Sequence, residues 1–162
     1  MMDPPTLMFY SMESIRVLRR ISKEGIMYID ATGNVLLGQS HCYVYEVVFR
    51  HHFGRNSPLA GASMITWAHD IPCIAHFSQR ILHGQNKQGS SRFYPRLVMF
   101  DGSMALINVI VCTIFKESLE GYFRRCWEIV NGRRESSLIS EAFLHFCAKH
   151  FMKYVKKFVR ST

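Results

Sequence analysis

Short apolar runs rich in β-branched and aromatic residues alternate along this chain with longer stretches of helical character. Four runs have the length and composition of strands, and they lie at residues 26–30, 43–49, 59–66 and 96–100. Four stretches are predicted to be helices, and they lie at residues 12–24, 71–83, 103–115 and 119–130. Helices that separate strands in this order predict an α/β fold with one mixed sheet flanked by helices.

The two ends of the chain are less regular. Residues 1–25 are expected to form a helical lead-in, and residues 26–162 the main domain. From about Leu138 the periodicity fits two alternatives, one long helix or the short strand FLHFC followed by a basic helix from about Lys149. The sequence pattern does not choose between them.

Capping residues set the expected helix bounds. Ser11 can cap the first helix, and Ser103 can cap the helix that runs to about Phe115. The helix at 119–130 is expected to end at the Asn131–Gly132 pair. Its outer face is predicted to carry four charged side chains, those of Glu120, Arg124, Arg125 and Glu128.

Composition places the chain among globular proteins, because 48% of its residues are hydrophobic and 20% are charged. Residues 97–115 are long enough for a membrane span, but Asp101 lies inside them and would cost about 2.5–3.5 kcal/mol at mid-membrane. A buried strand, a turn and a buried helix are predicted there instead, and no membrane partner is expected.

The cysteines and the first residues indicate the compartment. The five cysteines are odd in number and form no CxxC pair, which is typical of reduced thiols. The opening residues contain an acid and two prolines where a signal peptide needs a basic flank and an apolar core. The expected location is therefore nuclear or cytoplasmic.

Two aspartates are the leading candidates for chemistry, since Asp30 and Asp101 each close an apolar strand-like run. Open α/β sheets place ligand sites at the carboxyl ends of strands. Two carboxylates on neighbouring strands repel unless a cation lies between them, and such oxygen ligands suit Mg²⁺ or Mn²⁺. The alternative is that Asp30 begins the turn ATGN and Asp101 caps the following helix.

A thiol and an imidazole form a second candidate pair. Cys147 and His150 lie three residues apart and could ligate zinc from one helical face or from a turn. A closed zinc site needs four ligands, and Cys112, Cys126 and His145 supply no second pair. The alternative is that Cys147 is a small buried hydrophobic residue.

The C-terminal third is the basic end of a chain whose net charge is +8, and no acid follows Glu141. Five basic residues fall at helical spacing along one side of the last segment, namely Lys149, Lys153, Lys156, Lys157 and Arg160. Such a stripe can neutralise DNA phosphates in a salt-dependent way. It can also be a solvated face that keeps the domain in solution.

Beyond these patterns, the sequence resembles a known family. IDATGNVL around Asp30, and MFDGSMALINVI with the following SLEGYFRRCWEIVNG around Asp101, resemble the core of Mutator-like (MULE) DDE transposases. FCAKHFMK is similar to the CxxH element that this superfamily carries between its second and third acids. The resemblance covers nearly the whole chain.

The resemblance implies an RNase H-like fold and DNA transposition by metal-dependent strand cleavage and transfer. Asp30 and Asp101 would be the first two catalytic acids and would bind Mg²⁺ or Mn²⁺, with Cys147 and His150 as the CxxH element. DNA is the implied partner and is expected to bind weakly. Association with a second copy or with other transposase-derived proteins stays open.

The sequence departs from the family pattern at the third acid, a glutamate that follows the CxxH element. Glu135 and Glu141 precede Cys147, and the chain reaches Thr162 before any matching position. We therefore expect a domain truncated at its C-terminus and without activity. The alternatives are an active enzyme and a domesticated domain that binds nucleic acid or a partner protein without catalysis. Completeness of the acid set and salt-dependent DNA binding separate them.

Overall fold

The computed structural model describes residues 5–21, 26–35, 41–50, 58–83, 95–134 and 142–161. Within the helices, the side chains at positions 19, 21, 154, 160 and 161 lie outside this description. The account below concerns these described residues, and the loop expected at 84–94 falls outside them.

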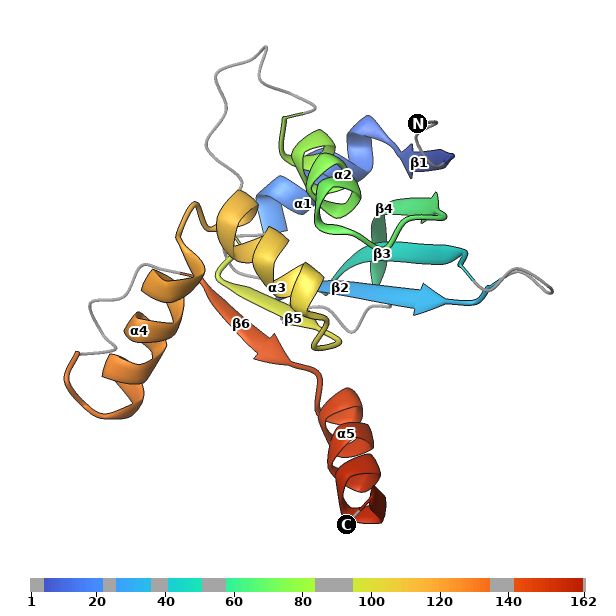
Figure 1. Cartoon of the computed structure of the whole chain (residues 1–162). Coiled ribbons are helices and arrows are strands. Elements are labelled where there is room, and N and C mark those ends of the chain that lie inside the picture. Colours follow the sequence, from blue (N-terminus) through green and yellow to red (C-terminus); the bar gives the residue numbers. More distant parts are fainter. Residues whose placement is uncertain are drawn as a thin grey trace.

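The described strands form one mixed sheet in the order β1-β4-β3-β2-β5-β6 (Figure 1). Their bounds are Thr6–Tyr10 (β1), Ile26–Gly33 (β2), Tyr43–Arg50 (β3), Leu59–Thr66 (β4), Leu97–Phe100 (β5) and Phe143–Phe146 (β6). The pairs β1–β4, β4–β3 and β3–β2 are antiparallel, whereas β2–β5 and β5–β6 are parallel. The predicted mixed sheet flanked by helices is confirmed.

The described helices are Met12–Ile21 (α1), Ile71–His83 (α2), Met104–Val109 (α3), the π-helical continuation Ile110–Ile114, Leu119–Val130 (α4) and Ala148–Ser161 (α5). Figure 1 shows α1, α2 and α3 on the same side of the sheet. Alternate strand residues such as Met27, Ile29, Val47 and Val98 point to this side and form the core with them. The opposite face of β2 and β3 carries partly or fully exposed residues.

Polar side chains fix the starts of three helices, as the sequence predicts for two of them. The Ser14 N–H donates to Ser11 Oγ at 2.9 Å, which caps α1. The Cys73 N–H donates to Asp70 Oδ1 at 2.9 Å, which caps α2. At α4 the Gly121 N–H donates to Ser118 Oγ at 3.1 Å. Each cap satisfies a backbone donor that the helix itself leaves unpaired.

The apolar segment 97–115 folds as predicted, into a buried strand, a turn and a buried helix. The Phe115 N–H donates to Ile110 O five residues earlier, so the last turn of this helix is π-helical. In the part of the chain that the structure describes, no helix is long and apolar enough to span a membrane.

The structure corrects the bounds of the first strands. The expectation that the strand at 26–30 ends on Asp30 is wrong, because β2 continues through Ala31 to Gly33 in antiparallel pairing with β3. Only the parallel neighbour β5 stops level with Ile29. In addition, the strand β1 pairs with β4 inside the segment expected to be a helical lead-in.

The C-terminal segment is a strand followed by a helix, and this settles the two alternatives. The strand β6 adds to β5 in parallel, and α5 begins at Ala148 immediately after Cys147. Figure 1 shows α5 projecting from the end of β6, away from the sheet, with the C-terminus at its far end.

The prediction that Arg125 lies on the outer face of α4 is wrong, since this residue is only 4% exposed. Its guanidinium donates to both carboxylate oxygens of Glu117, at 2.8 and 3.2 Å, and to Ala142 O at 3.2 Å. It also lies over the rings of Tyr122 and Phe143. Because Ala142 directly precedes β6, this cluster connects α4 to the edge strand of the sheet.

Candidate metal centre

The strands that carry the two predicted acids are neighbours in the sheet, which confirms the predicted adjacency. β2 and β5 pair in parallel up to Ile29 and Phe100. Counting one residue further along both strands places Asp101 beside Asp30. Neighbouring strands lie about 4.8 Å apart, so the two carboxylates are within reach of one cation.

The same level of the sheet carries two further polar residues. Glu46 of β3 is paired directly with Asp30, and residues directly opposite each other point to the same face. On the other side, β5 and β6 pair up to Phe100 and Phe146, and the Cys147 N–H donates to Phe100 O at 2.9 Å. Four strands therefore contribute a row of neighbouring residues, Glu46, Asp30, Asp101 and Cys147, which we call the polar row.

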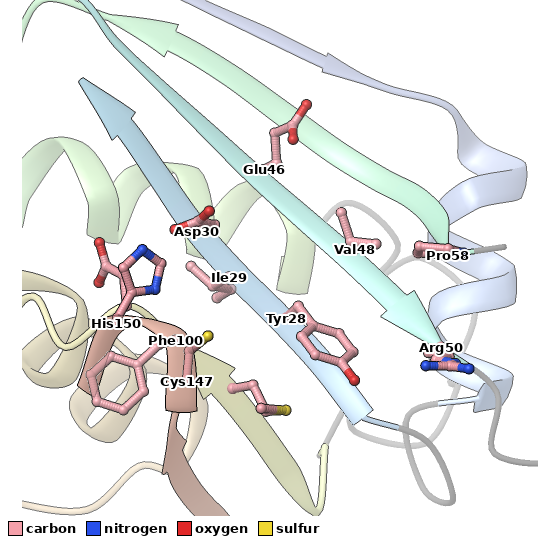
Figure 2. Close-up of a pocket in the computed structure, with 12 residues that line it drawn as sticks. Tyr28, Ile29, Asp30, Glu46, Val48, Arg50, Pro58, Phe100, Cys147 and His150 are labelled. Carbon is pink, nitrogen blue, oxygen red and sulfur yellow. The ribbon is translucent and has the colours of Figure 1, made fainter. Parts of the chain in front are cut away.

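The polar row borders a cavity of about 400 Å³ (Figure 2). All four of its members line this cavity, together with His150 from the first turn of α5. The remaining lining residues are Tyr28, Ile29, Val48, Arg50, Pro58, Met99 and Phe100. Acids, a thiol and an imidazole therefore share one concave site whose other walls are largely apolar, which is typical of ligand sites.

Each predicted acid makes one short-range backbone hydrogen bond. Asp30 is exposed, and its Oδ1 accepts from the Ala31 N–H at 3.0 Å. Asp101 is half-buried, and its Oδ1 accepts from the Ser103 N–H at 2.8 Å. The turn-capping alternative therefore describes part of what Asp101 does. The structure gives Oδ2 of neither aspartate a hydrogen bond to a described residue, so each could serve as a ligand.

The imidazole of His150 has one nitrogen that is closed off from solvent. Its Nδ1 is buried and has no hydrogen-bond partner among the described residues. Figure 2 shows this ring approaching Asp30 from the first turn of α5, with Cys147 below it. A buried polar atom without a partner costs free energy, so this nitrogen is suited to a group bound in the cavity.

The donor set fits a divalent cation but is not gathered around one. Carboxylate oxygens on neighbouring strands are the ligands that Mg²⁺ and Mn²⁺ prefer. Among the described residues, however, no three His, Cys, Asp or Glu side chains stand close enough to hold a metal ion. Mutual repulsion of the carboxylates accounts for this, since like charges spread apart when no cation lies between them.

The zinc alternative for Cys147 and His150 gains two neighbours and loses three. Both residues lie beside Asp30 and Asp101 in one cavity. The other candidates considered from sequence lie elsewhere, because Cys112 and His145 are exposed and Cys126 is on α4. None of these three lines the cavity.

The predicted basic stripe lies on α5. Four of its lysines are exposed, namely Lys149, Lys153, Lys156 and Lys157, while the side chain of Arg160 falls outside the described residues. Exposed apolar side chains lie between them, namely Phe151, Met152, Val155, Phe158 and Val159. The helix is therefore amphipathic and begins at the cavity, because His150 belongs to its first turn.

Sequence reasoning missed Glu46 and did not connect the acids with Cys147 and His150. The available clue for Glu46 was a charged residue inside the apolar run YVYEVVF. An acid in such a run indicates a solvent-facing position on a strand. Only the pairing of β2 with β3 shows that it faces Asp30.

Comparison of the chain with protein-family models, with curated proteins and with solved structures gives no match. The resemblance to Mutator-like transposases therefore rests on the residues of this chain, and the family assignment stays a prediction.

Proposed function

We propose that the chain is an RNase H-like domain of Mutator-like transposase origin that binds a divalent cation and DNA. The observation that carries the proposal is the position of Asp30 and Asp101, side by side on the central parallel strands at the edge of one cavity. In the parent family this position holds the first two acids of the catalytic triad.

The strand order supports the fold part of the proposal. β2, β3 and β4 form an antiparallel meander, and β5 and β6 continue the sheet in parallel on the other side of β2. This is the arrangement that an RNase H-like assignment implies. The Cys147–His150 pair supports it further, because it lies in the same cavity as the two acids.

Asp30 and Asp101 would hold the ion, with His150 at the cavity wall beside them. A bound Mg²⁺ or Mn²⁺ would supply the positive charge that stabilises phosphoryl oxygens. The chain's own part is to keep two carboxylates on neighbouring strands and to limit solvent on the apolar side of the cavity. The first turn of α5 leads from this cavity to four exposed lysines, where a DNA backbone would be held.

DNA binding is expected to be weak, independent of base sequence and steeply dependent on salt. Four exposed lysines on α5 can neutralise about four phosphates, so the logarithm of the binding constant should fall against the logarithm of salt with a slope of roughly −3 to −4. Charge reversal in the double variant Lys153→Glu, Lys157→Glu should reduce the slope by about two and weaken binding at least tenfold. Fluorescence anisotropy with a labelled duplex at several salt concentrations measures both.

A matched double variant separates the stripe from net charge. Arg16→Glu with Arg20→Glu changes the charge by the same amount at two exposed positions of α1. This control should bind DNA nearly as well as the wild type. An equal loss in both double variants would assign the effect to net charge, and unchanged binding in the α5 variant would make the stripe a solvated face.

We expect residues 1–162 to bind Mn²⁺ without cleaving DNA. In-line phosphoryl transfer needs both the attacking and the leaving oxygen stabilised, and the described residues present no preformed three-ligand group. A nicking assay on supercoiled DNA in Mg²⁺ and in Mn²⁺ tests this, with Asp30→Asn as the control. Cleavage that this substitution abolishes would show that the chain contains a complete active site.

A domesticated binding domain without catalysis is the second candidate function. The observation that favours it is α5, whose exposed apolar and basic residues project from the sheet and suit a polyanionic or protein partner. DNA binding that survives Asp30→Asn and needs no divalent ion would support this candidate over a metal-dependent one.

A further inference from the structure

We infer that Glu46 is a third carboxylate ligand of the divalent-metal site, so that the ion is held from three adjacent strands by Asp30, Asp101 and Glu46. This inference rests on the proposed function and adds a residue to its site. It differs from the pattern of the parent family, in which the third acid follows the CxxH element, because Glu46 lies between the two aspartates in sequence.

The sheet register carries the argument. Glu46 and Asp30 are direct partners in the antiparallel pair β2–β3, and their Cβ atoms are therefore about 4.5–5.5 Å apart on one face. Asp30 in turn lies beside Asp101. Asp30 is thus the centre of three neighbouring carboxylates, and all three line the cavity.

The burial pattern of β3 makes Glu46 an exception that a ligand would explain. The β3 residues on the core side, Tyr45 and Val47, are buried, while Glu46 faces the open side. Its direct partner on that side is another acid, Asp30, and like charges directly opposite each other destabilise a sheet. Arg50 lies a full four residues further along β3 and forms no described ion pair with Glu46. A divalent cation between the carboxylates removes this repulsion.

A second observation at the same place points to a bound group. His150 Nδ1 is buried, faces the cavity that the three acids line, and has no hydrogen-bond partner among the described residues. Figure 2 shows the ring directed toward Asp30, with Glu46 on the adjacent strand. A hydrated ion held by the three carboxylates would give this nitrogen its partner.

The three side chains are not drawn together in the structure, and the geometry allows them to be. Glutamate has one more rotatable bond than aspartate, so Glu46 can turn toward Asp30 without movement of the backbone. Asp101 is the more constrained ligand, since its Oδ1 accepts the Ser103 N–H. We therefore expect the ion to order Glu46 and to leave Asp101 in place.

The test is Mn²⁺ binding by the whole chain, measured as free Mn²⁺ by electron paramagnetic resonance and by calorimetry. Glu46→Gln and Asp30→Asn should each raise the dissociation constant at least tenfold. Glu120→Gln, an exposed acid on α4 outside the cavity, should leave it unchanged. Glu46→Asp should keep part of the affinity, because it shortens the ligand without removing it.

A second readout separates ligation from a structural role. Without metal, Glu46→Gln should raise Tm slightly, since it removes repulsion with Asp30, and with saturating Mn²⁺ it should show a smaller rise in Tm than the wild type. Mn²⁺ affinity that falls in Asp30→Asn but not in Glu46→Gln would overturn the inference and leave the proposed metal site intact. No Mn²⁺ binding by the wild-type chain would overturn both, and loss in Glu46→Gln with full affinity in Asp30→Asn would place the ion away from the polar row and overturn the inference.

Discussion

Replacing Arg125 by methionine should lower the free energy of unfolding by about 3 kcal/mol, because it breaks a buried ion pair from one side. Arg125 is 4% exposed and makes two hydrogen bonds to Glu117 and one to Ala142 O. The substitution fills similar space but leaves a largely buried carboxylate and a carbonyl without their donor. Urea unfolding followed by circular dichroism measures the change.

Two further variants test the cause. Arg16 and Glu13 form an ion pair at 3.5 Å whose side chains are 64% and 72% exposed, so Arg16→Met should change stability by less than about 0.5 kcal/mol. Adding Glu117→Leu to Arg125→Met should recover part of the loss, because it removes the unpaired charge. A loss as large in Arg16→Met would mean that ion-pair burial does not set the effect.

The cluster around Arg125 also matters for the candidate site. Ala142 precedes β6, and the Leu144 N–H donates to Tyr122 Oη at 2.8 Å. The helix α4 therefore holds the edge strand that ends at Cys147. Loosening this contact in Arg125→Met should weaken whatever the cavity binds, even though Arg125 does not line it.

Local sequence predicts the elements well, since their bounds depend on residues close together in the chain. Most strands and helices lie within a few residues of their predicted positions, and the Ser11 cap forms as expected. The adjacency of Asp30 and Asp101 follows from the same local pattern, because two strand-like runs that end in an acid can be expected to lie side by side in an α/β sheet.

What sequence could not predict depends on pairing across the sheet. Glu46 becomes part of the site only because its register with Asp30 is fixed, and a slip of one residue would turn it to the core. The same pairing keeps Ala31 extended where a turn is expected. Arg125 shows the equivalent limit for a helix, since periodicity identifies a face but not the glutamate that packs against it.

Gly102→Ala is expected to cost about 3 kcal/mol or more and to disturb the candidate metal site. Gly102 has φ of +93°, a conformation that costs other residues roughly 1–3 kcal/mol. A Cβ there would lie 2.0 Å from Cε2 of Phe146, whose ring packs edge-on against Phe100 and Phe151. Neither ring stack can give way without shifting β6, and overpacking of this kind adds its own cost.

The site should respond because Gly102 directly follows Asp101 and precedes Ser103, whose N–H holds the Asp101 carboxylate. Mn²⁺ affinity in Gly102→Ala should therefore fall at least tenfold at a temperature where the variant is still folded. Gly132→Ala is the matched control, since its φ is +67° but a Cβ there meets no atom within 4 Å. It should lose about 1 kcal/mol from backbone strain alone and keep full Mn²⁺ affinity. Equal losses of stability in the two variants would show that the contact with Phe146 adds nothing, and that the turn after Asp101 can relax without moving the carboxylate.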